Sequence, residues 1–351
     1  MQTYDLPVFL KIGKDTSKDV FNILDKEFIN TTEIKIIFFT SKMLYDIFKD
    51  YIDSLLNMRK NMTLFFVEDS SFEIAFNAAK RIALEEYDLI IGFGGGTILD
   101  TAKYASYVSE RPYIALPTTL SNDGVASPIS VLKVSETERR SFLCSSPDGI
   151  IVDTCFIINA PKTLLTAGIG DIISNYTALY DWRLEHKIKD TVPNDFACLL
   201  SDMSYNSLLM VDHKDLRNED FIAILSKSVV LSGLSMNIAG SSRPSSGSEH
   251  LFSHALDQYY NSQIAHGLKV ALGTIGAAIL QNRDYNQIVK FFKDLDIDVS
   301  PKTLKIDKDM FIDAWMKAMS TRPKRFTVLN TLELNEKLFS KLYDQIVEIL
   351  E

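Results

Sequence analysis

The feature that most constrains the fold is an alternation of short apolar runs with helical segments over about the first 160 residues. Runs such as EIKIIFF, YDLIIGF and YIALP alternate with segments such as SSFEIAFNAAKRIALEE, whose apolar residues recur at helical spacing. Strands that are apolar throughout are typical of parallel sheets covered by helices on both faces. We therefore predict an α/β domain over residues 1–161, with a helix N-cap near Ser17 and a second helix after Thr40-Ser41. SPISVLK and RRSFLCSSPDGIIVD indicate an added hairpin and a strand at the sheet edge.

The pattern changes after Pro161. Long segments with helical periodicity dominate, among them LLTAGIGDIISNYTALYDWRLEHK and NEDFIAILSKSVVLSGLSMNIAG, and the amphipathic segment KLFSKLYDQIVEILE lies at the end. The sequence therefore predicts an all-helical C-terminal domain over residues 162–351. With 351 residues, 46% of them hydrophobic, the chain is long enough to bury two domain-sized cores.

Candidate metal ligands gather in this helical half. Three of the five histidines, His250, His254 and His266, fall within 17 residues, and Asp171 lies about 80 residues upstream between small residues. One carboxylate and two or three imidazoles suit a divalent cation such as zinc, with one coordination position open for substrate. Histidines four apart share one face of a helix, but that spacing is also common without a metal, so it leaves the ligand set open. We expect the active site in the cleft between the two domains.

A glycine turn in DLIIGFGGGTILDTAK joins an apolar strand to a helix. Gly94, Gly95 and Gly96 let backbone N–H groups approach a pyrophosphate, and Thr97 can donate a hydroxyl or cap the helix. The spacing is not GxGxxG, so a tight structural turn remains the alternative. A second polar loop, ALPTTLSNDGVAS, follows the next strand, at the end where doubly wound sheets bind ligands. Its small hydroxyl side chains are those of Thr118, Thr119, Ser121 and Ser127.

Composition narrows the class of protein. The net charge of −9 argues against a general nucleic-acid binder. No stretch approaches the 18 to 20 uncharged apolar residues of a membrane span, and the start, MQTYDLPVFLKIGKD, lacks the apolar core of a secretory signal. Three cysteines without CxxC spacing indicate neither disulfides nor a thiolate metal site. We expect a cytoplasmic homo-oligomer that acts on a small molecule.

Five segments, taken in order, resemble one protein family. They are GFGGGTILDTAK, LPTTLSNDGVASP, GIGDIISNYTALYDW, SSRPSSGSEHLFSHALD and AHGLKVALGT, which span residues 92–274. They resemble the iron-type, metal-dependent alcohol dehydrogenase superfamily, which includes glycerol dehydrogenase and dehydroquinate synthase. Within it, SRPSSGSEH followed by FSHALD is similar to the sn-glycerol-1-phosphate dehydrogenase branch. The resemblance implies a Rossmann-like N-terminal domain and a helical metal-binding domain.

The resemblance also implies roles for individual residues. Asp171, His250 and His266 would bind the metal, usually zinc in this branch, although nickel and iron can share such ligands. His254 would face the substrate, as would Asp123, and Asp171 would contact substrate as well as metal. His254 could relay a proton between the substrate oxygen and solvent. The NAD(P) pyrophosphate and nicotinamide would be held by Gly94, Gly95, Gly96, Thr97, Ile98, Thr118, Thr119, Leu120, Ser121 and Ser127.

Two further features concern substrate and cofactor. Arg243 and Lys269 are cations next to the expected metal ligands, and we hypothesise that one or both hold a substrate phosphate. The strand IKIIFF ends in Thr40-Ser41-Lys42, without the acidic residue that binds the 2′-hydroxyl of NAD. NAD and NADP both remain open.

These observations favour an NAD(P)-linked, metal-dependent oxidoreductase that interconverts dihydroxyacetone phosphate and sn-glycerol 1-phosphate. The first alternative is a glycerol dehydrogenase, or another polyol dehydrogenase, with the same metal site. Dehydroquinate synthase would require several basic residues near these motifs, where few occur. A dinucleotide-binding sensor without catalysis would keep full function after mutation of His266.

Overall fold

The computed structural model describes residues 6–135 and 138–351, so the first five residues of the segment searched for a secretory signal lie outside it. The chain forms two compact units. The α/β unit contains the described residues up to Leu120 together with Gly124–Ala160. The helical unit contains Ser121–Asp123 and Pro161–Glu351. The short segment 121–123 therefore leaves the α/β unit and packs with the helices.

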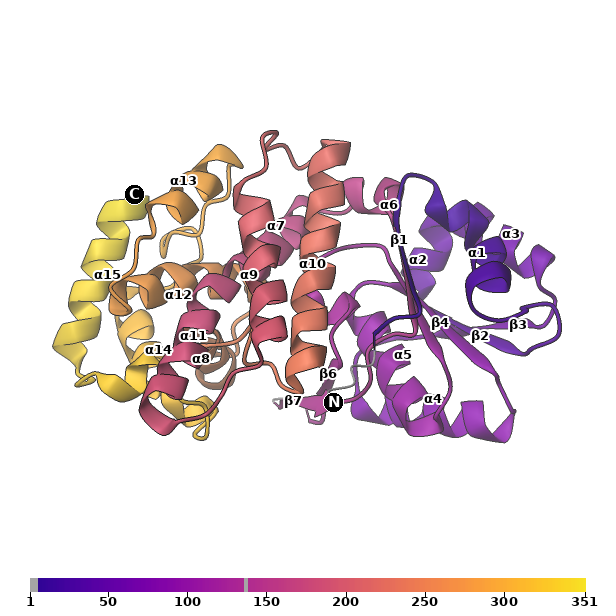
Figure 1. Cartoon of the computed structure of the whole chain (residues 1–351), viewed down its shortest axis with the longest axis horizontal. Helices are drawn as coiled ribbons and strands as arrows, with labels where there is room; N and C mark the ends of the chain where they lie inside the picture. Colours follow the sequence, from indigo (N-terminus) through magenta and orange to yellow (C-terminus); the bar gives the residue numbers. More distant parts are fainter. Residues whose placement is uncertain (1–5, 136–137) are drawn as a thin grey trace. The chain divides into compact units, whose positions relative to one another are not determined.

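A six-stranded parallel sheet forms the centre of the α/β unit (Figure 1). Its strand order is β1-β8-β5-β4-β2-β3. The four inner strands are buried along their whole length, because helices cover both faces of the sheet. This confirms the parallel sheet expected from continuous apolar runs. The strands are β1 (Phe9–Gly13), β2 (Ile36–Thr40), β3 (Met62–Phe66), β4 (Leu89–Gly94), β5 (Tyr113–Pro117) and β8 (Gly149–Asp153).

Successive residues of β4 show how both faces are covered. Ile91 and Phe93 belong to the hydrophobic cluster that includes Leu24 of α1 and Leu55 of α3. Gly92, between them, faces the opposite side, where an added Cβ would contact α5. The helices of this unit are η1 (Thr16–Asp19), α1 (Val20–Glu27), α2 (Lys42–Ile47), α3 (Lys49–Met58), α4 (Phe72–Leu84), α5 (Gly96–Ser109) and α6 (Thr154–Ile158).

One local expectation needs correction. The strand in DGIIVD, expected at the sheet edge, is β8 and lies between β1 and β5, because β1 pairs with its outer side. The helix expected with an N-cap near Ser17 begins as η1 and continues as α1, whose N-cap is Asp19. The Ser17 hydroxyl donates to the Asp153 carboxylate at 2.5 Å. The expected hairpin is present as an antiparallel pair, β6 (Ile129–Lys133) and β7 (Arg139–Leu143).

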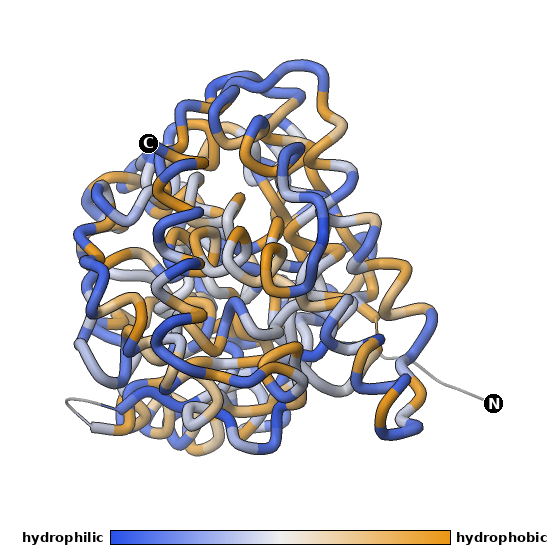
Figure 2. The backbone as a smooth tube through the Cα atoms, turned by 90° about the vertical axis from the view of Figure 1, so that its left-hand side faces the viewer, coloured by the Kyte–Doolittle hydropathy of each residue, from blue (hydrophilic) through white to orange (hydrophobic). Residues whose placement is uncertain are grey.

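The helical unit contains nine α-helices among the residues the structure describes. Hydrophobic and hydrophilic residues alternate along most of its backbone, as expected for helices with one buried face (Figure 2). The long segment expected over 164–187 is two helices that meet at Ser174. The helices are α7 (Lys162–Ile173), α8 (Asn175–Lys189), α9 (Asp195–Leu209), α10 (Glu219–Ala239), α11 (Ser248–Tyr260), α12 (His266–Leu280), α13 (Asn286–Asp294), α14 (Lys308–Thr321) and α15 (Glu336–Leu350), with η3 (Val328–Thr331) before the last.

One described helix, α10, is long and apolar enough to cross a membrane. The sequence survey did not identify it, because Glu219 and Asp220 precede the apolar run and Lys227 interrupts it. In the structure, 67% of its most apolar window is buried, and the helix packs against α9 and α7. It therefore has the surroundings of a core helix.

Candidate functional site

Asp171, His250 and His266 converge from three helices, α7, α11 and α12. Their ligand atoms all lie within 4.8 Å of one another. Asp171 Oδ1 is 3.5 Å from His250 Nε2 and 3.8 Å from His266 Nε2. One carboxylate and two imidazoles at this separation form a donor set that suits a divalent metal and leaves a coordination position open.

The other nitrogen of each imidazole has a polar partner. His250 Nδ1 lies 2.9 Å from Glu249 Oε1, and His266 Nδ1 lies 3.2 Å from Ser253 Oγ. Such partners set the tautomer and orient the opposite nitrogen, Nε2, towards a metal. Sequence reasoning missed both, although Glu249 directly precedes His250 and Ser253 follows three residues later.

Glu249 is itself held firmly. Its carboxylate is fully buried and accepts hydrogen bonds from the backbone N–H of Gly247 at 2.5 Å and the Thr177 hydroxyl at 2.8 Å. A carboxylate with these donors keeps one orientation, so the His250 ring that it contacts is fixed as well.

Two glycines bring α7 and α12 into backbone contact at the ligand cluster. Gly170 precedes Asp171, and Gly267 follows His266. A Cβ at Gly267 would overlap the Ala167 carbonyl oxygen, and a Cβ at Gly170 would overlap the Gly267 carbonyl oxygen. No side chain can separate the two helices here. The carboxylate of one helix and the imidazole of the other therefore reach the same point.

The residues of the cluster shift one another's pKa values. Burial acts to raise the pKa of Asp171, but hydrogen bonding to His250 holds that pKa below its usual value. Burial also opposes protonation of His250, but the carboxylates of Asp171 and Glu249 raise its pKa to about 9. Burial and the neighbouring charge of His250 lower the pKa of His266. This shift favours the neutral imidazole of His266, which is the form that binds metals.

Asp123 and His254 border the cluster without belonging to it. The backbone N–H of Asp123 donates to Asp171 Oδ2 at 3.1 Å, and its side-chain Oδ2 accepts from the Ser232 hydroxyl at 2.9 Å. The ring centroid of His254 is 6.1 Å from those of both His250 and His266. Burial and the positive charge of Arg322 hold the pKa of His254 well below its usual value. The two histidines four residues apart thus occupy different environments.

The glycine turn of the α/β unit has the form of a phosphate-binding turn. Strand β4 ends at Gly94, and α5 begins at Gly96. The N-cap is Gly95, which has no side chain to cap the first N–H groups of the helix. A Cβ at Gly95 would lie 3.0 Å from Thr119 Cγ2, so the turn and the next loop are in close contact. Thr97 is exposed and Ile98 is buried. The first N–H groups of α5 can therefore approach an anion.

The loop after β5 contributes buried hydroxyls. The buried hydroxyl side chains, at most 8% exposed, are those of Thr118, Thr119 and Ser127, and the apolar Leu120 between them is also buried. Thr119 Oγ1 has no hydrogen-bond partner, and neither does Thr40 Oγ1 at the end of β2. Buried polar atoms without partners are costly, so these hydroxyls suit a bound ligand. Ser121 is partly exposed and belongs to the helical unit.

Strand order places the loops after β4 and β2 at a topological switch point of the sheet. The connection after β2 runs outward to β3, whereas that after β4 runs the opposite way to β5. Adjacent strands with opposite connections define a topological switch point, the position at which doubly wound sheets bind ligands.

Known proteins are similar to this chain in sequence and in fold. The family described as iron-containing alcohol dehydrogenase matches residues 11–161. Glycerol-1-phosphate dehydrogenase (NAD(P)+) from Thermoplasma volcanium is 32% identical over an alignment of 359 residues, which covers 100% of this chain and 97% of that protein. The enzyme of the same name from Methanoregula boonei is 37% identical over 284 residues, or 79% of this chain and 78% of that protein. The chain belongs to the glycerol-1-phosphate dehydrogenase family.

The fold of this family member is also that of more distant proteins. The crystal structure of glycerol dehydrogenase from Schizosaccharomyces pombe superposes with a TM-score of 0.79 at 19% identity, covering 99% of this chain and 91% of that chain. This likeness confirms the α/β unit with its parallel sheet and the helical unit as one known fold.

The two cations singled out in the sequence both have partners. Arg243 forms a 2.7 Å ion pair with Glu185 and donates to the Phe326 carbonyl oxygen at 2.7 Å. Lys269 is 2% exposed and forms an ion pair with Asp257. Arg243 and Lys269 therefore both interact with protein groups, so neither is reserved for a substrate phosphate.

Proposed function

We propose that this chain is an NAD(P)-linked, metal-dependent oxidoreductase that interconverts dihydroxyacetone phosphate and sn-glycerol 1-phosphate by hydride transfer. The observation that carries the proposal is the convergence of Asp171, His250 and His266, with both imidazoles oriented through their Nδ1 atoms. Its relatives, at 32–41% identity, are glycerol-1-phosphate dehydrogenases, and the site has the donors that their chemistry requires.

The donor set supports zinc as the metal held by these three residues. Imidazole and carboxylate ligands in a site with an open position are typical of catalytic zinc, although nickel and ferrous iron fit the same donors. When bound, such an ion acts as a Lewis acid that polarises the carbonyl oxygen of the substrate.

The protein groups around the metal ligands orient the substrate and handle its proton. We propose that Asp171 and Asp123 contact the substrate, since the Asp123 backbone holds Asp171 and the Ser232 hydroxyl orients the Asp123 carboxylate. His254 has a lowered pKa and is partly exposed, so its neutral ring can exchange a proton between the substrate oxygen and solvent. Relays of this kind contribute ~10²–10⁴-fold in rate.

The nicotinamide cofactor supplies or accepts the hydride. We propose that Gly94 to Ile98 hold its pyrophosphate, and that Thr118 to Ser121 with Ser127 line the nicotinamide side. The exposed N-terminus of α5 and the unpartnered Thr119 hydroxyl support this assignment. Strand β2 ends in Thr40, where an acidic residue would bind the 2′-hydroxyl of NAD, and Lys42 just beyond it pairs with Asp46 at 3.0 Å. This arrangement is compatible with use of both NAD and NADP.

Substrate preference tests the proposed function. Zinc-loaded protein is expected to reduce dihydroxyacetone phosphate with a kcat/KM at least about 100-fold above that for dihydroxyacetone, because two charge-assisted hydrogen bonds to phosphate contribute about 3 kcal/mol. The measurement is oxidation of NADH and of NADPH with each substrate, repeated with nickel and with ferrous iron. Preference for dihydroxyacetone would instead assign a glycerol dehydrogenase. Inactivity with both substrates under every metal would contradict the proposal.

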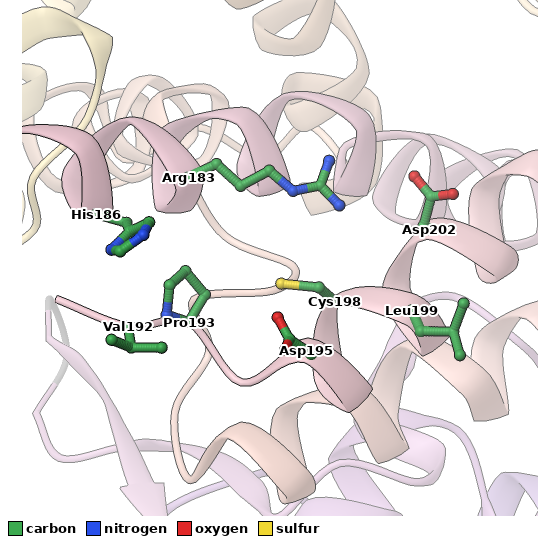
Figure 3. A pocket seen from close by; sticks show the side chains of 8 residues that line it. All are labelled: Arg183, His186, Val192, Pro193, Asp195, Cys198, Leu199 and Asp202. Carbon is green, nitrogen blue, oxygen red and sulfur yellow. The ribbon is translucent and has the colours of Figure 1, made fainter.

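We also propose that the enzyme is a homo-oligomer, with α9 in the subunit interface. Phe196, Leu199 and Met203 lie on one face of α9 and are 40–54% exposed, and Val192 beside them is 81% exposed. Val192 and Leu199 border a pocket of about 360 Å³ between α8 and α9 (Figure 3). Apolar groups that remain exposed together are typical of a protein–protein contact.

The prediction is that Leu199→Glu with Met203→Glu yields a smaller species than the unaltered protein. A buried charge at the contact would cost several kcal/mol, so light scattering after gel filtration should report a lower mass. Lys187→Glu, an exposed change of charge on α8, serves as the control and should leave the mass unchanged. A monomeric unaltered protein would contradict the proposal.

A cytoplasmic location is the remaining part of the proposal. All three cysteines, Cys144, Cys155 and Cys198, are free thiols in the structure. Free thiols are typical of reducing compartments.

A further inference from the structure

A second cluster of charge lies in the helical unit and is not used by the metal site. A pocket of about 440 Å³ opens between the end of α8, the loop before α11 and the segment after α14. Its lining carries four cations and a single carboxylate. The lining residues are Glu185, Arg243, Arg322, Pro323, Lys324 and Arg325.

The carboxylate is already engaged. Glu185 pairs with Arg243 at 2.7 Å and with Lys189 at 3.4 Å. Arg325 forms no ion pair within the described part of the chain; its guanidinium donates to the Ser242 hydroxyl at 2.9 Å and to the Ser246 carbonyl oxygen. Arg322 also donates to the Ser242 hydroxyl, at 3.3 Å. Two guanidinium groups therefore converge on one serine.

Like charges held this close destabilise one another. Burial and the neighbouring charges of Arg322 and Arg243 lower the pKa of Arg325 to about 9. A partly buried cluster of cations is costly unless an anion compensates it. The planar fork of arginine matches the oxygens of a phosphate, to which it donates two parallel hydrogen bonds.

Hydrogen bonds connect the pocket to a metal ligand. Arg325 donates to the Ser246 carbonyl oxygen, and the next residue, Gly247, donates its backbone N–H to the Glu249 carboxylate that contacts His250. The loop that carries Ser242 and Ser246 leads directly into α11, on which His250 lies. A three-carbon substrate, whose phosphate is a few bonds from its carbonyl, requires a phosphate site beside the metal ligands, and this loop adjoins one of them.

We propose that Arg322 and Arg325, with the Ser242 hydroxyl, bind the phosphate group of the substrate and so distinguish a phosphorylated from a free triose. This inference rests on the proposed function. It moves the phosphate contact from Lys269, which is buried against Asp257, to two arginines that the sequence survey did not single out. Arg243, paired with Glu185, supports the pocket wall.

The test compares two substrates in zinc-loaded variants. Arg325→Met and Arg322→Met are each expected to lower kcat/KM for dihydroxyacetone phosphate by about 100-fold, mainly through KM, and to change kcat/KM for dihydroxyacetone less than about threefold. Lysine at either position should restore part of the loss, because it keeps the charge without the fork. Lys337→Met, which removes an exposed cation of α15 outside the pocket, should have little effect. Equal losses with both substrates, or none with the phosphate ester, would overturn the proposal.

Inorganic phosphate provides a readout that does not need turnover. Calorimetric titration of the zinc-loaded protein should show phosphate binding that is lost in Arg325→Met and retained in Lys337→Met. If the unaltered enzyme reduced only dihydroxyacetone while phosphate binding still depended on Arg325, the proposed function would fail and the anion site would stand. If the enzyme preferred the phosphate ester while neither arginine affected phosphate binding, only the anion site would fail.

Discussion

Replacing His266 with alanine is expected to lower kcat/KM for dihydroxyacetone phosphate by about 10³-fold or more and to reduce the bound metal well below one ion per chain. The imidazole of His266 is one of three ligand groups within 4.8 Å of one another, and two donors cannot hold the ion as firmly. Loss of the Lewis acid removes several kcal/mol of transition-state stabilisation, and each 1.36 kcal/mol is about tenfold in rate. Metal analysis of the purified variant and steady-state kinetics measure the two effects.

Two other histidines provide the controls for this experiment. His213→Ala removes an exposed imidazole and should change neither metal content nor activity. His254→Ala should keep the metal but lose turnover, because His254 borders the ligand cluster without joining it. Intact cofactor binding in His266→Ala, with no turnover in the unaltered protein to lose, would instead favour a sensor without catalysis.

Replacing Gly267 with alanine is expected to destabilise the helical unit by about 2–4 kcal/mol and to abolish metal binding at micromolar concentrations. The new methyl group would overlap the carbonyl oxygen of Ala167, so α12 must move away from α7. That movement separates His266 from Asp171, which lie next to the two glycines in contact. Thermal unfolding with and without zinc measures both parts: the melting temperature falls, and zinc no longer raises it.

Gly13→Ala is the matched control, because a Cβ there would meet only Thr16 Cγ2, at the ordinary contact distance of 3.5 Å. It should leave metal affinity unchanged. If Gly267→Ala bound zinc as tightly as the unaltered protein, the close approach of α7 and α12 would not be what positions the ligands.

Much of the fold follows from local pattern. The inner strands are apolar at nearly every position, and the helix after Ser41 begins where the Ser41 side chain accepts a hydrogen bond from the Leu44 N–H. These features depend on neighbours within a few residues, so they can be recognised from the sequence. The position of β8 could not be, because the pairing of Phe9 with Gly149 joins residues far apart in the chain.

The candidate site divides in the same way. The kinds of ligand and the glycine turn follow from the sequence, since Asp171, the histidines and Gly94 to Gly96 stand in recognisable motifs. The contacts of Glu249 and Ser253 with the imidazoles, and the pocket that Arg322 and Arg325 share with Arg243, arise only in the folded chain. The physical reason is that coordination and charge compensation act over a few ångströms in space. They join α7, α11, α12 and the segment after α14, whose order along the chain does not reveal their contacts.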